Sequence, residues 1–328
     1  MATGVASQLA GPAGMGALRV PLLAVTVAVA LAIVGLGVSG RRPRRAGRPV
    51  VGFGDFTVPI GLAVVGSGLA RLGGPGVAAA DGVVAAAWII TGVLAATVVV
   101  PVTAAPPGLA AVGGTWFLAP AALLADAIGA GAVAGPTTGH SPALGWLAVA
   151  AAGLGIVGYL AVMGVAAVRV VVHRVAGVPR APWWIAAGCG GLSAAAVGRI
   201  SAVDPLGRGG AILHGSGWVA LGCWVVGGIA LVPVLAGSLR YLVGLRRLVG
   251  RPPWPPTFST GVYALGAGQV GRLLGNPAIV RVGEVAAVGT IGLWLLTVVA
   301  HLPRLARHLP RFPGGGPDAP CRPLTPPR

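Results

Sequence analysis

Side chains that could carry out chemistry are few in this chain and lie far apart. The three Cys and five His residues form no pair at the spacing of a metal motif or a disulfide framework, so we expect no metal site, no disulfide and no cofactor. Among the six acidic residues we find no close pair for general acid and base catalysis, and the chain has no glycine-rich phosphate loop. The sequence therefore argues against an enzyme.

The charged residues inside or near apolar runs are the stronger candidates. Asp126 lies well inside such a run, where an ionisable group is a functional candidate by default; we favour a structural ion pair with Arg199 or Arg272. Arg71, Arg199 and Arg272 each lie near the end of an apolar run. Three guanidinium groups around one opening would concentrate anions without binding them tightly. The alternative is that these side chains snorkel toward lipid headgroups.

The segments that must position these residues are strongly apolar. Of the 328 residues, 55% are hydrophobic and 9% charged, and the mean hydropathy is +0.88. A soluble globule could not bury that much apolar surface, and a disordered chain would be poorer in it. The composition predicts an all-α, polytopic membrane protein surrounded by the lipid bilayer. The 23 basic residues are all Arg and cluster between apolar runs, which favours membrane topology over a nucleic-acid partner.

Hydropathy predicts nine transmembrane helices. They cover residues 17–39, 52–72, 83–104, 113–134, 144–171, 183–201, 216–239, 256–275 and 283–302. We therefore expect an N-terminal extension at 1–16, a transmembrane domain at 17–302 and a disordered cytoplasmic tail at 303–328. If the spans alternate, 17 Arg lie on one side and six on the other. We expect the protein in the plasma membrane, and the positive-inside rule then places its C-terminus in the cytoplasm and its N-terminus outside.

Two kinds of span alternate along the chain. Spans rich in Val, Leu and Ala are expected to face lipid, whereas the second, fourth, sixth and eighth spans carry small residues and helix breakers. Pro59 and Pro120 fall inside two of these, where each would remove a backbone hydrogen bond and kink the helix. Small residues allow either tight helix packing or room for a lumen, and composition does not decide between them.

Three segments resemble helices of the tellurite-resistance/dicarboxylate transporter (TDT) family, which includes TehA-like proteins and plant slow anion channels. The resembling segments are GGTWFLAPAALLADAIGAGAVAG at 113–135 for the fifth helix, PWWIAAGCGGLSAAAVGRI at 182–200 for the seventh, and WPPTFSTGVYALGAGQVGRLLG at 254–275 for the ninth. The resemblance implies ten helices in five hairpins around one pore, which the odd-numbered helices line, often in a homo-trimer. The nine spans would then be helices two to ten.

The resemblance also implies a function and a gate. It implies a channel or transporter for small anions such as C4-dicarboxylates, tellurite, sulfite or halides, with Phe258 as the ring that occludes the pore; the alternative is that Phe258 packs between helices. Ser259 stands where the family usually has a proline, so any kink there is expected to be weaker, and with Gly261 it is expected to line the pore. No predicted span corresponds to the first helix of the family. A non-transporting scaffold derived from this fold by loss of that helix is therefore the alternative function.

Overall fold

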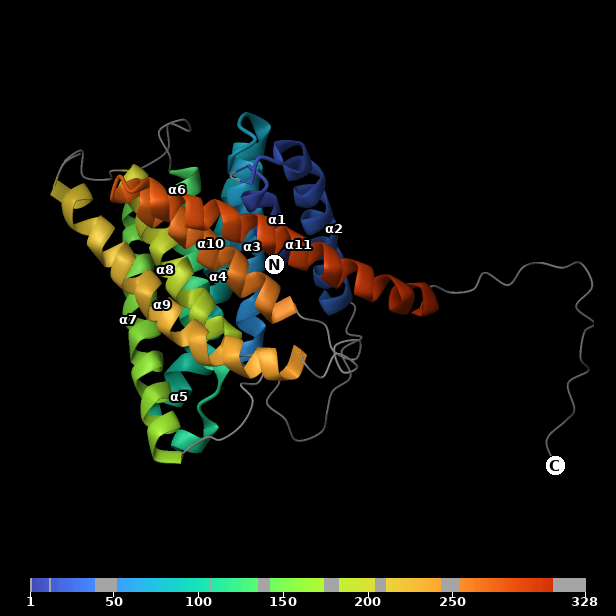
Figure 1. The fold of residues 1–328 in the computed structure, drawn as a ribbon. Helices are drawn as coiled ribbons and strands as arrows, with labels where there is room; N and C mark the ends of the chain where they lie inside the picture. Colours follow the sequence, from blue (N-terminus) through green and yellow to red (C-terminus); the bar gives the residue numbers. More distant parts are fainter. Residues whose placement is uncertain are drawn as a thin grey trace, which may run out of the picture.

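The computed structural model describes residues 2–11, 13–38, 52–106, 108–134, 142–173, 183–203, 211–242 and 254–308. Within these ranges every regular element is helical, which confirms the all-α prediction. Figure 1 shows the helices packed into one bundle. Most of the arginines behind the predicted sidedness, and the tail beyond residue 308, lie outside the described residues.

Seven helical segments of the described chain are long and apolar enough to cross a membrane. They are Phe53–Ala70, Pro75–Ala104, Gly114–Val133, Ala143–Val172, Trp184–Val203, Gly215–Leu235 and Pro277–Val299. Two further helices, α2 (Arg19–Val38) and α10 (Trp254–Leu273), coincide with predicted spans but do not belong to these seven. The multi-pass architecture is thus confirmed, while the count of nine spans is not.

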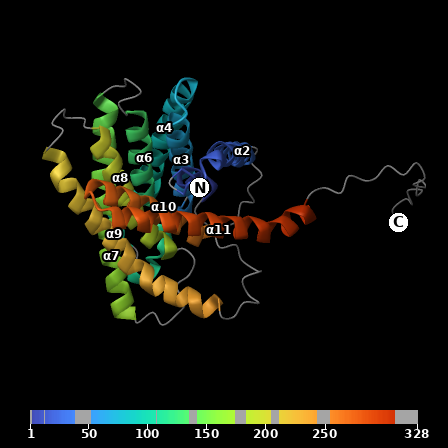
Figure 2. The ribbon, with the colours of Figure 1, turned by 45° about the horizontal axis from the view of Figure 1, so that its top comes forward.

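The helices form an inner ring and an outer layer. The inner ring contains α1 (Ala2–Leu9), α3 (Thr57–Ala70), α6 (Leu118–Val133), α8 (Trp184–Val203) and α10, which contact one another in this order, and α10 closes the ring on α1. The outer layer contains α2, α4 (Pro75–Leu94), which continues through a π-turn at Ala95–Val99 into α5 (Val100–Ala104), then α7 (Pro142–His173), α9 (Ala211–Leu242) and α11 (Pro277–His308). Figures 1 and 2 show α7 and α9 on the flank of the bundle opposite α2.

The inner and outer helices differ in the share of their residues that is buried. In the most apolar stretch of α6 and of α8, 78% of the residues are buried, against 17% in α7 and 22% in α9. The outer helices instead expose large apolar side chains such as Ile89, Val171, Trp218 and Val285. A surface of this kind is stable against acyl chains and not against water. The alternation of lipid-facing and small-residue spans in the sequence therefore corresponds to the outer and inner layers.

Glycines of α8 allow two other helices to approach closely. A Cβ atom on Gly190 would lie 2.5 Å from the Cα of Gly227 in α9, and one on Gly191 would lie 2.4 Å from the Cα of Tyr263 in α10. Neither distance leaves room for a methyl group, so backbone approaches backbone at both positions. The segment Cys189–Leu192 thus fixes α8 between α9 and α10.

Helix α1 is the main difference from the sequence prediction. Residues 1–16 were predicted to be an extension, with no counterpart of the family's first helix, yet Ala2–Leu9 is a helix that contacts α2, α3, α10 and α11. Its Val5 and Leu9 side chains are buried. An eight-residue helix is too short for a hydropathy window of a full span, which is why it escapes detection. It fills the place in the ring that we expected to be vacant.

The two prolines predicted to kink spans instead lie where α-helices begin. Pro59 is the third residue of α3 and follows the 3-10 turn Phe53–Phe56, and Pro120 is the third residue of α6 and follows the 3-10 turn Gly114–Phe117. A first-turn residue has no intrahelical acceptor for its N–H, so proline costs little there. Both prolines are buried, and Pro120 packs toward Gly158 of α7.

The connection between α10 and α11 is tight and capped. Gly275 has a φ of +61°, a conformation that favours glycine, and the Asn276 side-chain oxygen accepts hydrogen bonds from the N–H groups of Ala278 and Ile279. This turn holds the end of α10 against the start of α11. Helix α11 then continues to His308, past the predicted end of the transmembrane domain at residue 302.

Candidate functional site

The five inner helices meet around a small central cavity of about 20 Å³. Each of the five contributes to its lining, which consists of Val5, Gln8, Ala63, Val64, Ser67, Ala125, Ile128, Leu192, Val262 and Leu265. A volume of roughly 10–15 Å³ on this measure already holds one water molecule, so the cavity has room for little more. We call this space the lumen cavity. At this level of the bundle, the side chains of the inner helices leave space for about one water molecule.

Three phenylalanine rings lie beyond the lumen cavity, toward the N-terminal ends of the inner helices. These helices run in one direction because an outer helix returns between each consecutive pair. Phe258 precedes the lining residue Val262 by one turn of α10, which places it on the lumen-facing side of that helix. Phe56 and Phe117 lie in the 3-10 turns before α3 and α6, and the Phe117 ring packs against Tyr159 of α7 and against Trp183. Phe258, Phe56 and Phe117 are 7%, 1% and 0% exposed, and they belong to one apolar cluster. Phe258 lies on α10 one turn before the lumen cavity and is not one of the residues that line it.

The C-terminal ends of the inner helices bring the predicted arginines together. Arg71 follows α3, Arg199 lies in the last turns of α8, and Arg272 lies in the last turn of α10. Desolvation by the surrounding helix ends, and then the positive charges of Arg199, Arg19 and Arg272, lower the pKa of Arg71 to about 10, although its side chain keeps contact with solvent. Arg71 remains a cation at pH 7. This end of the bundle is therefore electropositive.

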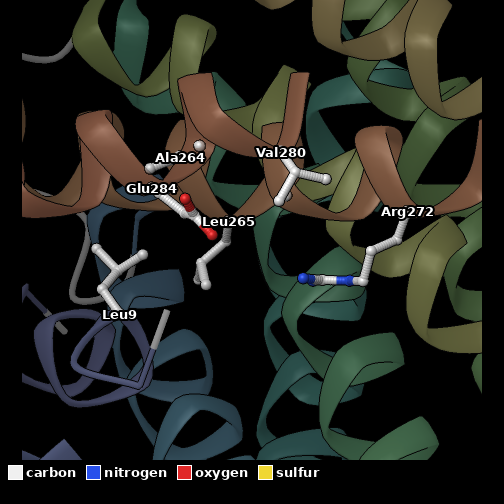
Figure 3. Close-up of a pocket in the computed structure, with 8 residues that line it drawn as sticks. Leu9, Ala264, Leu265, Arg272, Val280 and Glu284 are labelled. Carbon is white, nitrogen blue, oxygen red and sulfur yellow. The ribbon is translucent and has the colours of Figure 1, made fainter. Parts of the chain in front are cut away.

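A larger pocket of about 130 Å³ lies at the same end, between α1, α10 and α11 (Figure 3). Arg272 and Glu284 are its charged lining residues, and Figure 3 shows the Arg272 side chain directed into it. Leu265 lines both this pocket and the lumen cavity, so its side chain separates the two spaces. Glu284 also forms a 3.6 Å ion pair with Arg281. The pocket therefore adjoins the lumen cavity at Leu265, on the side of the ring that faces α11.

Ser259 and Gly261 contribute to helix packing in the structure. Ser259 is 1% exposed and lies against Gly188 of α8, while Gly261 lies against Val5 of α1. Neither residue belongs to the lining of the lumen cavity. Helix α10 is continuous from Trp254 to Leu273 through both positions.

Asp126 is completely buried on α6, at 0% exposure. Neither of its carboxylate oxygens has a hydrogen-bond partner in the part of the chain that the structure describes, and the Thr91 side chain of α4 lies beside it. The predicted ion pair with Arg199 or Arg272 is not observed among these residues. Asp126 therefore faces the outer helix α4, whereas its neighbours Ala125 and Ile128 line the lumen cavity.

Sequence reasoning missed two residues of the lumen cavity, Gln8 and Ser67. They are the polar side chains of its lining, and the Gln8 Nε2 atom donates a hydrogen bond to Ser67 Oγ at 2.6 Å. Gln8 was missed because α1 is shorter than a membrane span. A serine between two glycines of a small-residue span was a visible signal for Ser67.

Comparison with known families gives a match over most of the chain. A family model described as voltage-dependent anion channel (SLAC1) matches residues 1–302, a range that includes α1 and most of α11. No curated protein sequence matches the chain.

Proposed function

The chain belongs to the voltage-dependent anion channel (SLAC1) family, and from this premise we propose that it conducts small anions through the lumen between its five inner helices. Membership implies an anion channel or transporter rather than an enzyme. The observation that best supports a central route is the closed ring of α1, α3, α6, α8 and α10, each of which lines the lumen cavity. The exposed apolar faces of the outer helices support a bilayer around this ring.

In this proposal, the electropositive end of the bundle attracts anions toward the lumen. Arg71, Arg199 and Arg272 raise the local concentration of anions at the pocket that adjoins the lumen cavity. Because Arg71 and Arg272 are in contact with solvent, salt screens their charges over roughly 8–10 Å at physiological ionic strength, and the attraction stays weak. Weak attraction suits a conduit, since an anion must leave as readily as it enters.

In this proposal, the aromatic ring of Phe258 closes the lumen. An aromatic ring in a narrow apolar lumen excludes water, so an anion passes only after the ring has turned aside. The lumen cavity has room for about one water molecule, which corresponds to a closed state. Selection among C4-dicarboxylate, tellurite, sulfite and halide anions then depends on the width of the opened lumen and on the electropositive end.

The test is chloride efflux from vesicles that contain the purified protein. We expect Phe258→Ala to increase efflux several-fold over wild type, because the closing ring is removed. Phe53→Ala is the matched control, since Phe53 lies in the 3-10 turn that precedes α3 and its ring stacks on Trp116 at a centroid distance of 5.0 Å. Absence of efflux from folded wild type and folded Phe258→Ala alike would overturn the proposal.

Such an absence would favour the alternative of a non-transporting scaffold. That alternative depended on a missing first helix, and α1 occupies the corresponding place between α3 and α10. We also propose a homo-trimer in the plasma membrane, as the family resemblance implies. The protein mass of the detergent-solubilised particle tests the assembly, with three chains of 32.0 kDa expected.

A further inference from the structure

We propose that Gln8 and Ser67 form the anion-selecting contact of the lumen, a pair of neutral hydrogen-bond donors that bind a partly dehydrated anion when the lumen is open. This inference rests on the proposed channel function and adds to it a site and the chemistry of its ligand. The ligand class is a small inorganic anion whose oxygen or halide accepts hydrogen bonds.

The placement of the two side chains is the first observation. They come from different inner helices, α1 and α3, and both line the lumen cavity, whose other lining residues are apolar. Gln8 is 7% exposed and Ser67 is 0% exposed. Polar side chains are costly in such a position unless they are hydrogen-bonded, so a purely apolar lining would be the simpler way to close the lumen.

The hydrogen bonds of the pair are the second observation. Gln8 Nε2 donates to Ser67 Oγ at 2.6 Å and to the carbonyl oxygen of Val64 at 3.4 Å, and Ser67 Oγ donates to the same carbonyl at 3.0 Å. Both amide hydrogens and the hydroxyl hydrogen therefore have acceptors within the protein. In the closed lumen, the hydrogen-bond donors of Gln8 and Ser67 therefore all have acceptors within the protein, and none is unpaired.

When the lumen is open, an anion can replace the protein acceptors of these hydrogen bonds. An anion that enters a narrow apolar passage must shed water, and donors on the wall replace part of the lost hydration. Gln8 and Ser67 can turn their hydrogens from each other and from Val64 toward the anion, because an anionic acceptor makes the stronger hydrogen bond. Neither side chain is charged, so the contact favours anions without trapping them.

The position of the pair along the axis agrees with this role. Ser67 lies one turn before Arg71 on the same face of α3, so the pair follows directly inward from the electropositive end. Phe258 lies one turn before the lining residue Val262, on the far side of the cavity. An anion would thus meet the arginines, then the pair, and then the closing ring.

The test measures permeability ratios in planar bilayers, in the open Phe258→Ala background, with chloride on one side and nitrate on the other. Gln8→Met and Ser67→Ala remove the donors. Because chloride is more strongly hydrated than nitrate, it gains more from those donors, and we expect the nitrate-to-chloride permeability ratio to rise at least several-fold. Loss of chloride current with retained nitrate current would be the extreme of the same shift.

The matched control is Ser201→Ala. Ser201 is a buried serine of α8 whose hydroxyl donates to Val197 in its own helix at 2.9 Å, as that of Ser67 donates to Val64, but it does not line the lumen cavity. We expect it to leave the ratio unchanged. A second variant, Gln8→Glu, nearly preserves the shape of the side chain and places an acid in the lumen. We expect it to suppress the anion current. The comparison uses protein whose gel-filtration profile and unfolding midpoint equal those of the parent.

Two results would overturn the inference. The first is an unchanged permeability ratio in Gln8→Met and Ser67→Ala with current retained, which would reduce the pair to a contact between α1 and α3. The second is parental anion current in Gln8→Glu. Absence of current in the Phe258→Ala parent would instead contradict the proposed function, so the two failures are distinguishable.

Discussion

Arg272 offers the most direct test of the electropositive end, because it is exposed and its side chain enters the pocket beside the lumen cavity. We expect Arg272→Gln to lower chloride efflux at low ionic strength, and the deficit to shrink near 1 M salt, where the screening length falls to about 3 Å. Arg272→Lys keeps the charge and should retain efflux. Glu284→Gln removes the negative charge of the same pocket and should act in the opposite direction. An Arg272→Gln deficit that is independent of salt would contradict an electrostatic role.

Asp126 poses a different question, because it is buried without a partner among the described residues and faces α4 instead of the lumen. An unpaired buried carboxyl contributes unfavourably to folding, and asparagine has the same shape without the charge. We therefore expect Asp126→Asn to leave the midpoint of thermal unfolding in detergent unchanged or raised, with efflux as in wild type. Asp126→Ala is the size control and should lower the midpoint by leaving a void. A lowered midpoint in Asp126→Asn would contradict this account.

At the level of helices, the close approach of α8 to α10 makes a sharp prediction about Gly191. A methyl group there would lie 2.4 Å from the Cα of Tyr263, a backbone atom that cannot turn aside. We expect Gly191→Ala to destabilise the protein by about 1–3 kcal/mol or more, the usual range for overpacking, with a lower unfolding midpoint. A methyl group on Gly222 of α9 would have no neighbour within 4 Å, so Gly222→Ala should stabilise slightly through helix propensity. Equal midpoints for the two variants would mean that α8 and α10 are not in close contact.

The helices also show how far the sequence alone could lead. Hydropathy finds helices such as α6 and α8 because lipid and tight packing both demand long apolar runs, and the small residues of those helices correctly predict the inner layer. It cannot find α1, whose eight residues owe their position to contacts with α3 and α10 and not to their own length. The position of Pro59 in the first turn of α3 could not be predicted, because a span prediction does not reveal where a 3-10 turn gives way to an α-helix.

The positions of site residues along a single helix could be predicted from the sequence, whereas contacts between residues of different helices could not. The end positions of Arg71, Arg199 and Arg272 follow from span boundaries, and their convergence follows from inner helices that run in one direction. The pairing of Gln8 with Ser67 joins residues 59 positions apart in sequence, and only the closure of the ring by α1 brings them together. The contacts of Trp183 with Phe117 and with the Arg169 guanidinium likewise join segments that are distant in sequence.

For the molecule as a whole, the orientation in the membrane decides which end of the lumen meets which compartment. The arginine distribution predicts that the connection between α3 and α4 is external and that the connection after α5 is cytoplasmic. Leu72 and Ala105 are exposed positions in these two connections. In a Cys321→Ser background, where Cys189 and Cys223 are buried, each can be replaced by cysteine as a reporter.

We expect a membrane-impermeant thiol reagent to label Leu72→Cys in intact cells and to label Ala105→Cys after the membrane has been opened. Because Leu72 adjoins Arg71, labelling of Leu72→Cys from outside would also place the electropositive end and its pocket on the external face. The parent without added cysteines is the control for reaction at the two buried thiols. The reverse pattern would invert the protein, and anions would then be attracted from the cytoplasm and meet Phe258 last on their way out. The arginines, the pair of Gln8 and Ser67, and Phe258 would keep their order along the lumen. The direction of anion flow that this order favours would be reversed.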